Sequence, residues 1–128
     1  STDVENSCIK NYGADEKSSK TYKTYSGIQI DLSKFDDGQF VLNDGSLILL
    51  ENGSSVRTYI SVDVNGIGKK PNRLGKDLFM FQIMNNGELL PMGAKGTDYY
   101  SENNEYCAST SSNTMNGAGC TINVLTEI

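Results

Sequence analysis

The stretch that decides the fold is Ser61–Phe81, SVDVNGIGKKPNRLGKDLFMF. It begins inside an alternating run, Tyr59–Val64, and ends inside a second one, Leu78–Met84. Strict alternation of this kind predicts β-strands. The loop between the two runs is rich in Gly, Asn, Lys and Asp and contains Pro71, so it should not continue either strand. The stretch therefore predicts two strands joined by a long polar loop.

Alternation also divides the side chains of the two runs between the faces of a sheet. In the first run the sets are Ile60, Val62 and Val64 on one face, and Tyr59, Ser61 and Asp63 on the other. In the second run they are Phe79, Phe81 and Ile83 against Met80 and Gln82.

Further strands are expected on both sides of this pair. Ser26–Ser33, SGIQIDLS, alternates as a strand does, and Phe40–Leu42 and Leu47–Leu50 flank a turn whose Asp-Gly pair favours a hairpin. After Met84, an Asn-Asn-Gly turn leads into Glu88–Gly93, ELLPMG. Cys120–Ile128, CTINVLTEI, is predicted to form a closing strand.

The length of 128 residues suits one domain with a core of its own. Residues 1–24 are polar, with a short helical turn expected near Val4–Ile9, and residues 25–128 form a sheet-rich head. Hairpin connections predict a mainly antiparallel sheet with little helix, in the α+β class. The long polar segment Ala94–Gly119 is expected to hold little regular structure.

The charge balance excludes one class of partner. The chain has 11 Lys and Arg residues against 16 Asp and Glu residues, a net charge of −5. A nucleic-acid surface needs clustered positive charge, so we expect no nucleic-acid partner. The one basic cluster lies in the glycine-rich loop and is interpreted as solvated: Lys69, Lys70, Arg73 and Lys76.

Two further absences bound the function. The chain as given has no apolar run of 18 residues, so it contains no membrane span or signal peptide of its own. It has no histidine, the commonest general base, and no nucleophile–base pair stands out. We therefore expect no catalytic residues and a protein that is not an enzyme.

Three cysteines bear on the compartment. Cys107 and Cys120 bracket a loop of small residues that closes without strain, which favours a disulfide over two unpaired buried thiols. Such a bond indicates the periplasm or the cell exterior. Cys8 would then have no partner within the chain.

The loop after the first strand offers oxygen ligands of the kind calcium prefers. They are the side chains of Asp63, Asn65, Asn72 and Asp77, with the carbonyl of Ile67 as a further donor. The opening Asp-x-Asn-Gly resembles the start of an EF-hand loop, but the closing acid comes too late and is Asp rather than Glu. The alternative is that these side chains bind the loop's own backbone and fix its turns.

Three segments together resemble a known family. ISVDVNGIGKKPNRLGKDLFMFQI, then GELLPMG, then GAGCTINVL near the C-terminus are similar to the head domain of type IV pilin-like proteins and type II secretion pseudopilins. The resemblance covers about Tyr25–Leu125. It implies a pilin-like head, without its N-terminal helix, in a structural subunit of a pilus or pseudopilus filament.

That resemblance carries further expectations. The partners would be other pilin-like subunits, and both assembly and membrane contact would depend on an apolar N-terminal helix. The head would lie at the cell surface, in an extracellular filament or in the periplasm, and some heads of this family bind calcium. The isolated chain is expected to be a monomer.

A binding module is the alternative function. In that case the Ala94–Gly119 segment would recognise a surface ligand, as in an adhesin. Tyr99, Tyr100 and Tyr106 would then form a contact surface, although covering the sheet is the favoured interpretation of these rings.

Overall fold

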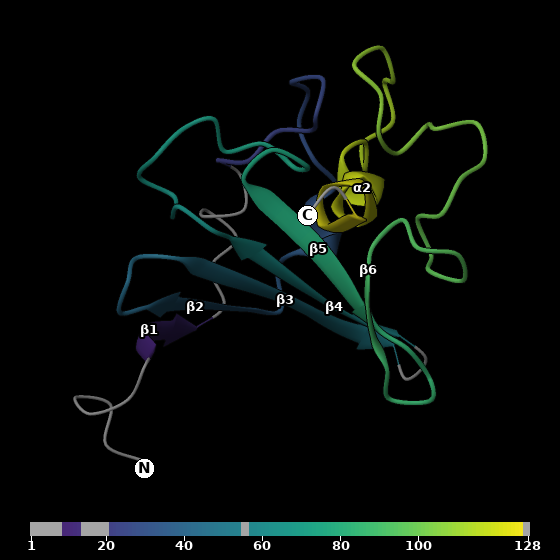
Figure 1. Cartoon of the computed structure of the whole chain (residues 1–128). Coiled ribbons are helices and arrows are strands. Elements are labelled where there is room, and N and C mark those ends of the chain that lie inside the picture. Colours follow the sequence, from purple (N-terminus) through teal and green to yellow (C-terminus); the bar gives the residue numbers. More distant parts are fainter. Residues whose placement is uncertain (1–8, 14–20, 55–56, 127–128) are drawn as a thin grey trace.

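A computed structural model describes residues 9–13, 21–54 and 57–126. Within them the chain forms a mainly antiparallel sheet whose six strands follow one another in sequence order (Figure 1). The strands are β1 (Ile9–Gly13), β2 (Gly38–Leu42), β3 (Leu47–Ser54), β4 (Arg57–Asp63), β5 (Leu78–Ile83) and β6 (Leu89–Pro91). Each of these strands pairs with its neighbours in the sequence, so the described part of the sheet is an antiparallel meander.

Among the described residues, helical structure consists of short pieces. They are two 3-10 helices, η2 (Leu32–Lys34) and η3 (Ala118–Cys120), and one α-helix, α2 (Thr121–Thr126). In the part of the chain that the structure describes, none of them has the length and apolar character needed to cross a bilayer. The α-helix follows η3 directly and lies beside β5 and β6 (Figure 1).

The predicted hairpins are confirmed. Between β2 and β3, Gly45 has a φ of 92°, a left-handed conformation that glycine adopts at little cost. The carboxylate of Asp44 accepts hydrogen bonds from the backbone N–H and the hydroxyl of Ser46 at 2.9 and 2.6 Å. Strands β4 and β5 pair antiparallel, with Asp63 opposite Leu78.

The strand expected over Ser26–Ser33 is wrong. Local hydrogen bonds occupy this segment instead: the N–H of Thr24 donates to the carbonyl of Ile28, and the N–H of Ile28 donates to the hydroxyl of Thr24. Further on, the carboxylate of Asp31 accepts a hydrogen bond from the N–H of Ser33 and caps η2. These side-chain bonds offer the backbone an alternative to a strand ladder.

The closing strand expected over Cys120–Ile128 is also wrong, because α2 occupies Thr121–Thr126. A backbone N–H of β5 that a further strand could have paired with already donates a hydrogen bond. The hydroxyl of Thr121 accepts a hydrogen bond from the N–H of Met80 in β5 at 3.0 Å. A side chain therefore takes the place of a further strand beside this half of β5.

The N-terminal segment contains a strand that its polar composition did not reveal. Strand β1 pairs antiparallel with β2, with an irregularity between Ile9 and Asn11. The helical turn expected near Val4–Ile9 falls mostly outside the described residues. The bulk of Ala94–Gly119 holds turns rather than regular structure, as expected.

The two faces of the sheet have different surroundings. Across β3, β4 and β5, one face carries Leu47, Leu49, Tyr59, Ser61, Asp63, Leu78, Met80 and Gln82, all of which are buried. The register places apolar side chains on the other face, and each is only partly buried. These residues, which we call the apolar face, are Phe40, Leu42, Ile48, Leu50, Ile60, Val62, Phe79, Phe81 and Ile83.

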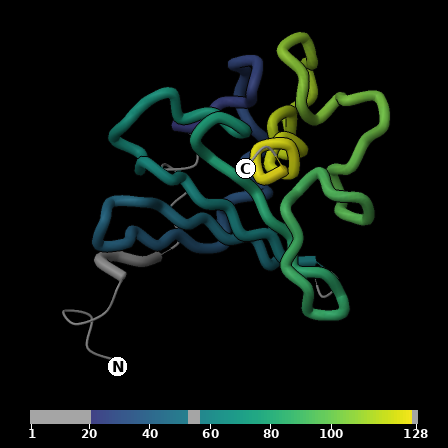
Figure 2. The backbone as a smooth tube through the Cα atoms, viewed as in Figure 1, coloured from purple at the N-terminus to yellow at the C-terminus, as the bar shows by residue number. Residues whose placement is uncertain are grey.

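The core lies on the first of these faces. The segment 21–37 crosses the sheet there, and the later loops complete the cover (Figure 2). The covering side chains are Tyr22, Ile30, Phe35, Leu74, Met92, Met115 and Ala118. The alternation predicted for β4 is correct, but its more polar set of side chains faces the core.

Candidate functional site

The loop between β4 and β5 brings its two acidic residues to the same end of the sheet. Asp63 is the last residue of β4, and Asp77 directly precedes β5. The N–H of Val64 donates to the carbonyl of Asp77 at 3.1 Å, so the loop closes on itself. Both acidic residues are buried, at 0% and 3% exposure. The sequence prediction that these two residues mark the ends of the loop is correct.

Asp63 is held by donors from two parts of the chain. One carboxylate oxygen accepts from the N–H of Asn65 at 3.2 Å and from the N–H of Gly66 at 3.1 Å. The other oxygen accepts from the hydroxyl of Tyr22, which is also fully buried. Burial raises the pKa of Asp63, while the bond from Tyr22 opposes that rise and the nearby charge of Asp77 adds to it.

Asp77 binds the other half of the loop. Its two oxygens accept from the N–H of Asn72 at 2.9 Å and from the N–H of Arg73 at 2.8 Å. Asn72 has a φ of 54°, a left-handed conformation that Asn tolerates better than most residues. The carboxylate therefore fixes the turn that follows Pro71. Within the described residues, neither Asp63 nor Asp77 forms an ion pair with a Lys or Arg.

The remaining predicted ligands are Asn65, Ile67 and Asn72, and they differ in whether their oxygen atoms already accept a hydrogen bond. The carbonyl of Ile67 accepts from the side-chain amide of Asn72 at 2.9 Å. The side-chain oxygens of Asn65 and Asn72 are buried and have no hydrogen-bond partner among the residues that the structure describes. Buried polar atoms are normally satisfied, so two such oxygens in one loop need an explanation. A cation with oxygen ligands would provide one, and the donor set fits calcium in this respect.

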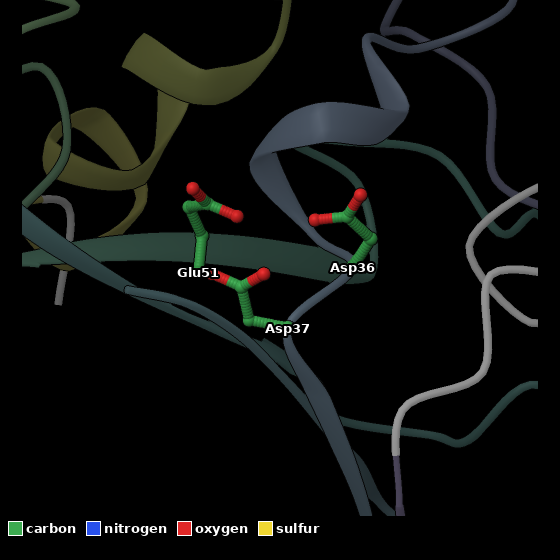
Figure 3. Close-up of side chains that lie close together, drawn as sticks. All are labelled: Asp36, Asp37 and Glu51. Carbon is green, nitrogen blue, oxygen red and sulfur yellow. The ribbon is translucent and has the colours of Figure 1, made fainter. Parts of the chain in front are cut away.

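A second acidic group was not predicted as a site. Asp36, Asp37 and Glu51 place carboxylate oxygens within 4.8 Å of one another (Figure 3). The sequence analysis did not connect the first two, which precede β2, with Glu51 in β3, because only the β2–β3 register brings them together. Burial raises the pKa of Glu51 to about 7, and hydrogen bonding to Asp37 adds to the rise. The carboxyl group of Glu51 can therefore carry a proton near neutral pH.

The apolar face has a groove at its β5 end. The groove has a volume of about 340 Å³ and lies between β4, β5 and α2. Its lining is Val62, Val64, Phe79, Phe81, Thr121, Val124 and Leu125. Val64 is 61% exposed and Leu125 is 42% exposed, which is high for apolar residues adjoining a sheet. Contiguous exposed apolar surface of this kind marks interaction sites.

The predicted disulfide is confirmed. Cys107 and Cys120 are bonded, 13 residues apart in sequence. The bond therefore leaves Cys8 without either of them as a partner, and Cys8 itself lies outside the described residues. Disulfides persist in oxidising compartments, so the bond is compatible with a periplasmic or extracellular location.

The tyrosines of the long loop divide between the two roles considered for them. Tyr99 and Tyr106 pack against the core and meet edge to face, with ring centroids 5.0 Å apart. Tyr99 also lies 6.0 Å from the ring of Tyr59. Tyr100 is 39% exposed. Two of the rings therefore cover the core, and the third reaches solvent.

Comparison with known proteins adds no relative. No protein-family model matches the chain, and no curated protein or solved structure is significantly similar to it.

Proposed function

We propose that this chain is the globular head of a pilin-like filament subunit, in a type IV pilus-like or type II secretion pseudopilus assembly. The observation that carries the proposal is the apolar face. A sheet whose two faces are both apolar normally has a layer packed on each of them. Here the described core layer covers one face, and α2 borders the other face at its β5 end. That other face still offers nine partly exposed apolar side chains and a groove.

The occupant that fits this face is an apolar helix preceding the head. A helix lies across a sheet as a second layer, and its side chains would enter the groove lined by Val64, Phe79 and Leu125. Burial of each large apolar side chain contributes about 1.5–3 kcal/mol, so several together would hold the helix firmly. The free part of the helix would join other subunits. The head would then lie at the cell surface or in the periplasm, where the Cys107–Cys120 bond persists.

The loop between β4 and β5 has a structural role in this proposal. It ties the ends of the two strands that form the groove, and a calcium ion between Asp63 and Asp77 would fasten it. The unpartnered oxygens of Asn65 and Asn72 support the ion. The carbonyl of Ile67 already accepts one hydrogen bond and would have to accept the ion as well. Calcium would contribute charge neutralisation at two buried carboxylates and no chemistry.

The experiment measures whether the apolar face is covered in the assembled protein. A cysteine is introduced at Ile60, on the apolar face, in a chain whose Cys8 is replaced by Ser. The matched control carries its cysteine at Ser33, which is exposed on η2. Maleimide labelling is compared between the isolated head and the protein as assembled by the cells that make it.

The expected result is protection at position 60 on assembly, with position 33 labelled equally in both samples. Equal labelling of position 60 in the two samples would contradict the proposal. The coding sequence upstream of Ser1 provides an independent check, since the proposal expects an apolar helix after a short basic leader.

A further inference from the structure

A small cavity lies beside the disulfide, between the tyrosine-bearing loop and the start of α2. Its volume is about 190 Å³, below the roughly 300–1,000 Å³ of sites for drug-sized ligands. It is lined by Gly93, Tyr99, Tyr100, Ser101, Asn104, Tyr106, Cys107, Gly119, Ile122 and Asn123. It shares none of these residues with the groove of the apolar face, so an inference about it is independent of filament assembly.

Two glycines that line the cavity allow close approach of the segments around it. A Cβ atom at Gly93 would lie 2.3 Å from the carbonyl oxygen of Gly119, well inside van der Waals contact. One at Gly119 would lie 3.1 Å from Cβ of Tyr106. Larger residues at these positions would force the loop and α2 apart, so close backbone approach fixes the floor of the cavity.

The walls are fixed as well. The carbonyl of Tyr106 accepts from the N–H of Gly117 at 2.7 Å and from the N–H of Gly119 at 3.0 Å. The disulfide ties the next residue, Cys107, to Cys120. A cavity held in this way pays little ordering cost when a ligand enters, which favours binding of even a small molecule.

The lining specifies a chemical class. Tyrosine rings offer apolar faces with hydroxyl groups at their edges, and the side-chain amides of Asn104 and Asn123 offer oxygen acceptors and N–H donors. The hydroxyl of Ser101 already bonds to Asn103, and the side-chain amide of Asn123 donates one hydrogen bond to Sγ of Cys107 at 3.7 Å. None of the described residues that line the cavity is charged. A matching ligand is small and uncharged, has C–H groups on one side to stack on an aromatic ring, and has hydroxyl groups around its edge. We propose that this cavity is a subsite for a single neutral sugar ring.

Asn104 supports a binding role through its backbone. Its φ of 66° is left-handed, a conformation that costs energy for a residue with a side chain. Its carbonyl accepts from the N–H of Cys107 at 3.2 Å, which closes a turn at the mouth of the cavity. Glycine would meet the backbone requirement better, so the amide side chain is what distinguishes Asn here.

The test is titration of the ¹⁵N-labelled chain with methyl glycosides of glucose, galactose, mannose and N-acetylglucosamine. N-acetylneuraminic acid is the charged comparator. We expect at least one neutral glycoside to shift amide signals of residues 93, 99–107 and 119–123, with a dissociation constant on the order of 1 mM. The acidic sugar should bind at least tenfold more weakly.

Two variants locate the site without disturbing the fold. Tyr100→Ala removes the exposed ring, and Asn104→Gly removes the amide while keeping the left-handed backbone. Each should weaken binding about tenfold, with the melting temperature changed by less than a few degrees. Tyr25→Ala is the control, because this tyrosine lies outside the cavity.

Three results would each overturn the proposal. The first is no shift with any neutral glycoside, and the second is shifts mapped to another part of the chain. The third is binding by Tyr100→Ala and Asn104→Gly equal to that of the Tyr25→Ala control. None of these results bears on whether the apolar face is covered in the assembled protein, so the two proposals fail separately.

Discussion

The hydroxyl of Tyr22 donates a hydrogen bond to the carboxylate of Asp63, 41 residues away, and both side chains are fully buried. This contact joins the segment that covers the core to the last residue of β4. It also satisfies an anion that would otherwise be costly to bury. The loop after β4 is therefore anchored from beneath by a residue of another segment, as well as by its own backbone.

Tyr22→Phe tests this contact. The variant keeps the ring and removes one donor from a buried carboxylate, so we expect a loss of about 1–3 kcal/mol of unfolding free energy. Urea denaturation measures the loss, and Tyr25→Phe is the control at a partly exposed tyrosine. Equal stability of Tyr22→Phe and the wild type would show that the hydrogen bond contributes nothing.

Alkaline pH provides a second test of the buried tyrosines. Burial raises the pKa of Tyr99 to about 12 and raises the pKa of Tyr22 further. Since the unfolded chain ionises near the ordinary value of 10, it releases protons that the folded chain retains. Stability should therefore fall as the pH rises above 10, and less so in Tyr22→Phe. A free energy of unfolding that does not change between about pH 9 and about pH 11, where tyrosines ordinarily titrate, would contradict this.

Calcium should stabilise the folded chain. With two carboxylates and neutral oxygens we expect a dissociation constant on the order of 10⁻⁴ to 10⁻³ M, so calcium at ten times that value adds about 1.4 kcal/mol. Melting curves in calcium and in chelator measure the effect. Asp63→Ala and Asp77→Ala should remove the calcium response.

The same variants separate the two interpretations of the loop. If wild-type curves coincide at millimolar calcium, no ion binds and the side chains only fix the turns. Both variants should destabilise the chain in chelator as well, by about 1–3 kcal/mol, because backbone N–H groups of Asn65, Gly66, Asn72 and Arg73 lose their acceptors.

The carboxylates of Figure 3 should make stability depend on pH near neutrality. The pKa of Glu51 is raised from an ordinary value of 4.5 to about 7, so the folded chain binds a proton that the unfolded chain releases. This contribution is fully present below pH 4.5 and is lost as the pH rises to about 7. Glu51→Gln should reduce that loss, measured as the unfolding free energy at pH 5 and 8. An unchanged pH dependence in Glu51→Gln would show that Glu51 is not the group that titrates.

Removing the disulfide should cost stability through the unfolded chain. A closed loop of this size contributes about 3 kcal/mol in the chain-entropy picture, so Cys107→Ala combined with Cys120→Ala should lower the unfolding free energy by about that amount. Reduction of the wild type should have a similar effect, whereas Cys8→Ala should not. A double variant as stable as the wild type would contradict the expectation.

The sequence predicted the parts of this fold in which local pattern and long-range pairing agree. The alternation around Ile60 and Phe81 and the Asp-Gly turn before Ser46 each define strands that the register keeps. The sequence prediction failed where hydrogen bonds from side chains take the place of the backbone hydrogen bonds of a sheet. Thr24 and Asp31 turn an alternating segment into a turn and a 3-10 helix, and Thr121 blocks the edge that a last strand would need.

The site residues show the same division. Asp63 and Asp77 stand out in the sequence because they lie at the two ends of a long polar loop. Tyr22, which contacts Asp63, has no comparable feature in the sequence around it. Glu51 meets Asp36 and Asp37 only through the register of β2 and β3. Two glycines far apart in sequence, Gly93 and Gly119, lie so close beside the disulfide that a Cβ atom on Gly93 would clash with the carbonyl of Gly119. Contacts of this kind depend on the assembled fold and not on spacing along the chain.

The bonded edge of β5 has a consequence for how copies of this chain can associate. An open sheet edge invites another chain to add a strand, which is a common route to unwanted aggregation. Here β6 is three residues long and ends in Pro91, which has no N–H to offer, and Thr121 occupies the neighbouring N–H of Met80. Edge-to-edge extension is therefore obstructed on this side. An ordered array of such subunits would therefore have to grow through surfaces other than this edge.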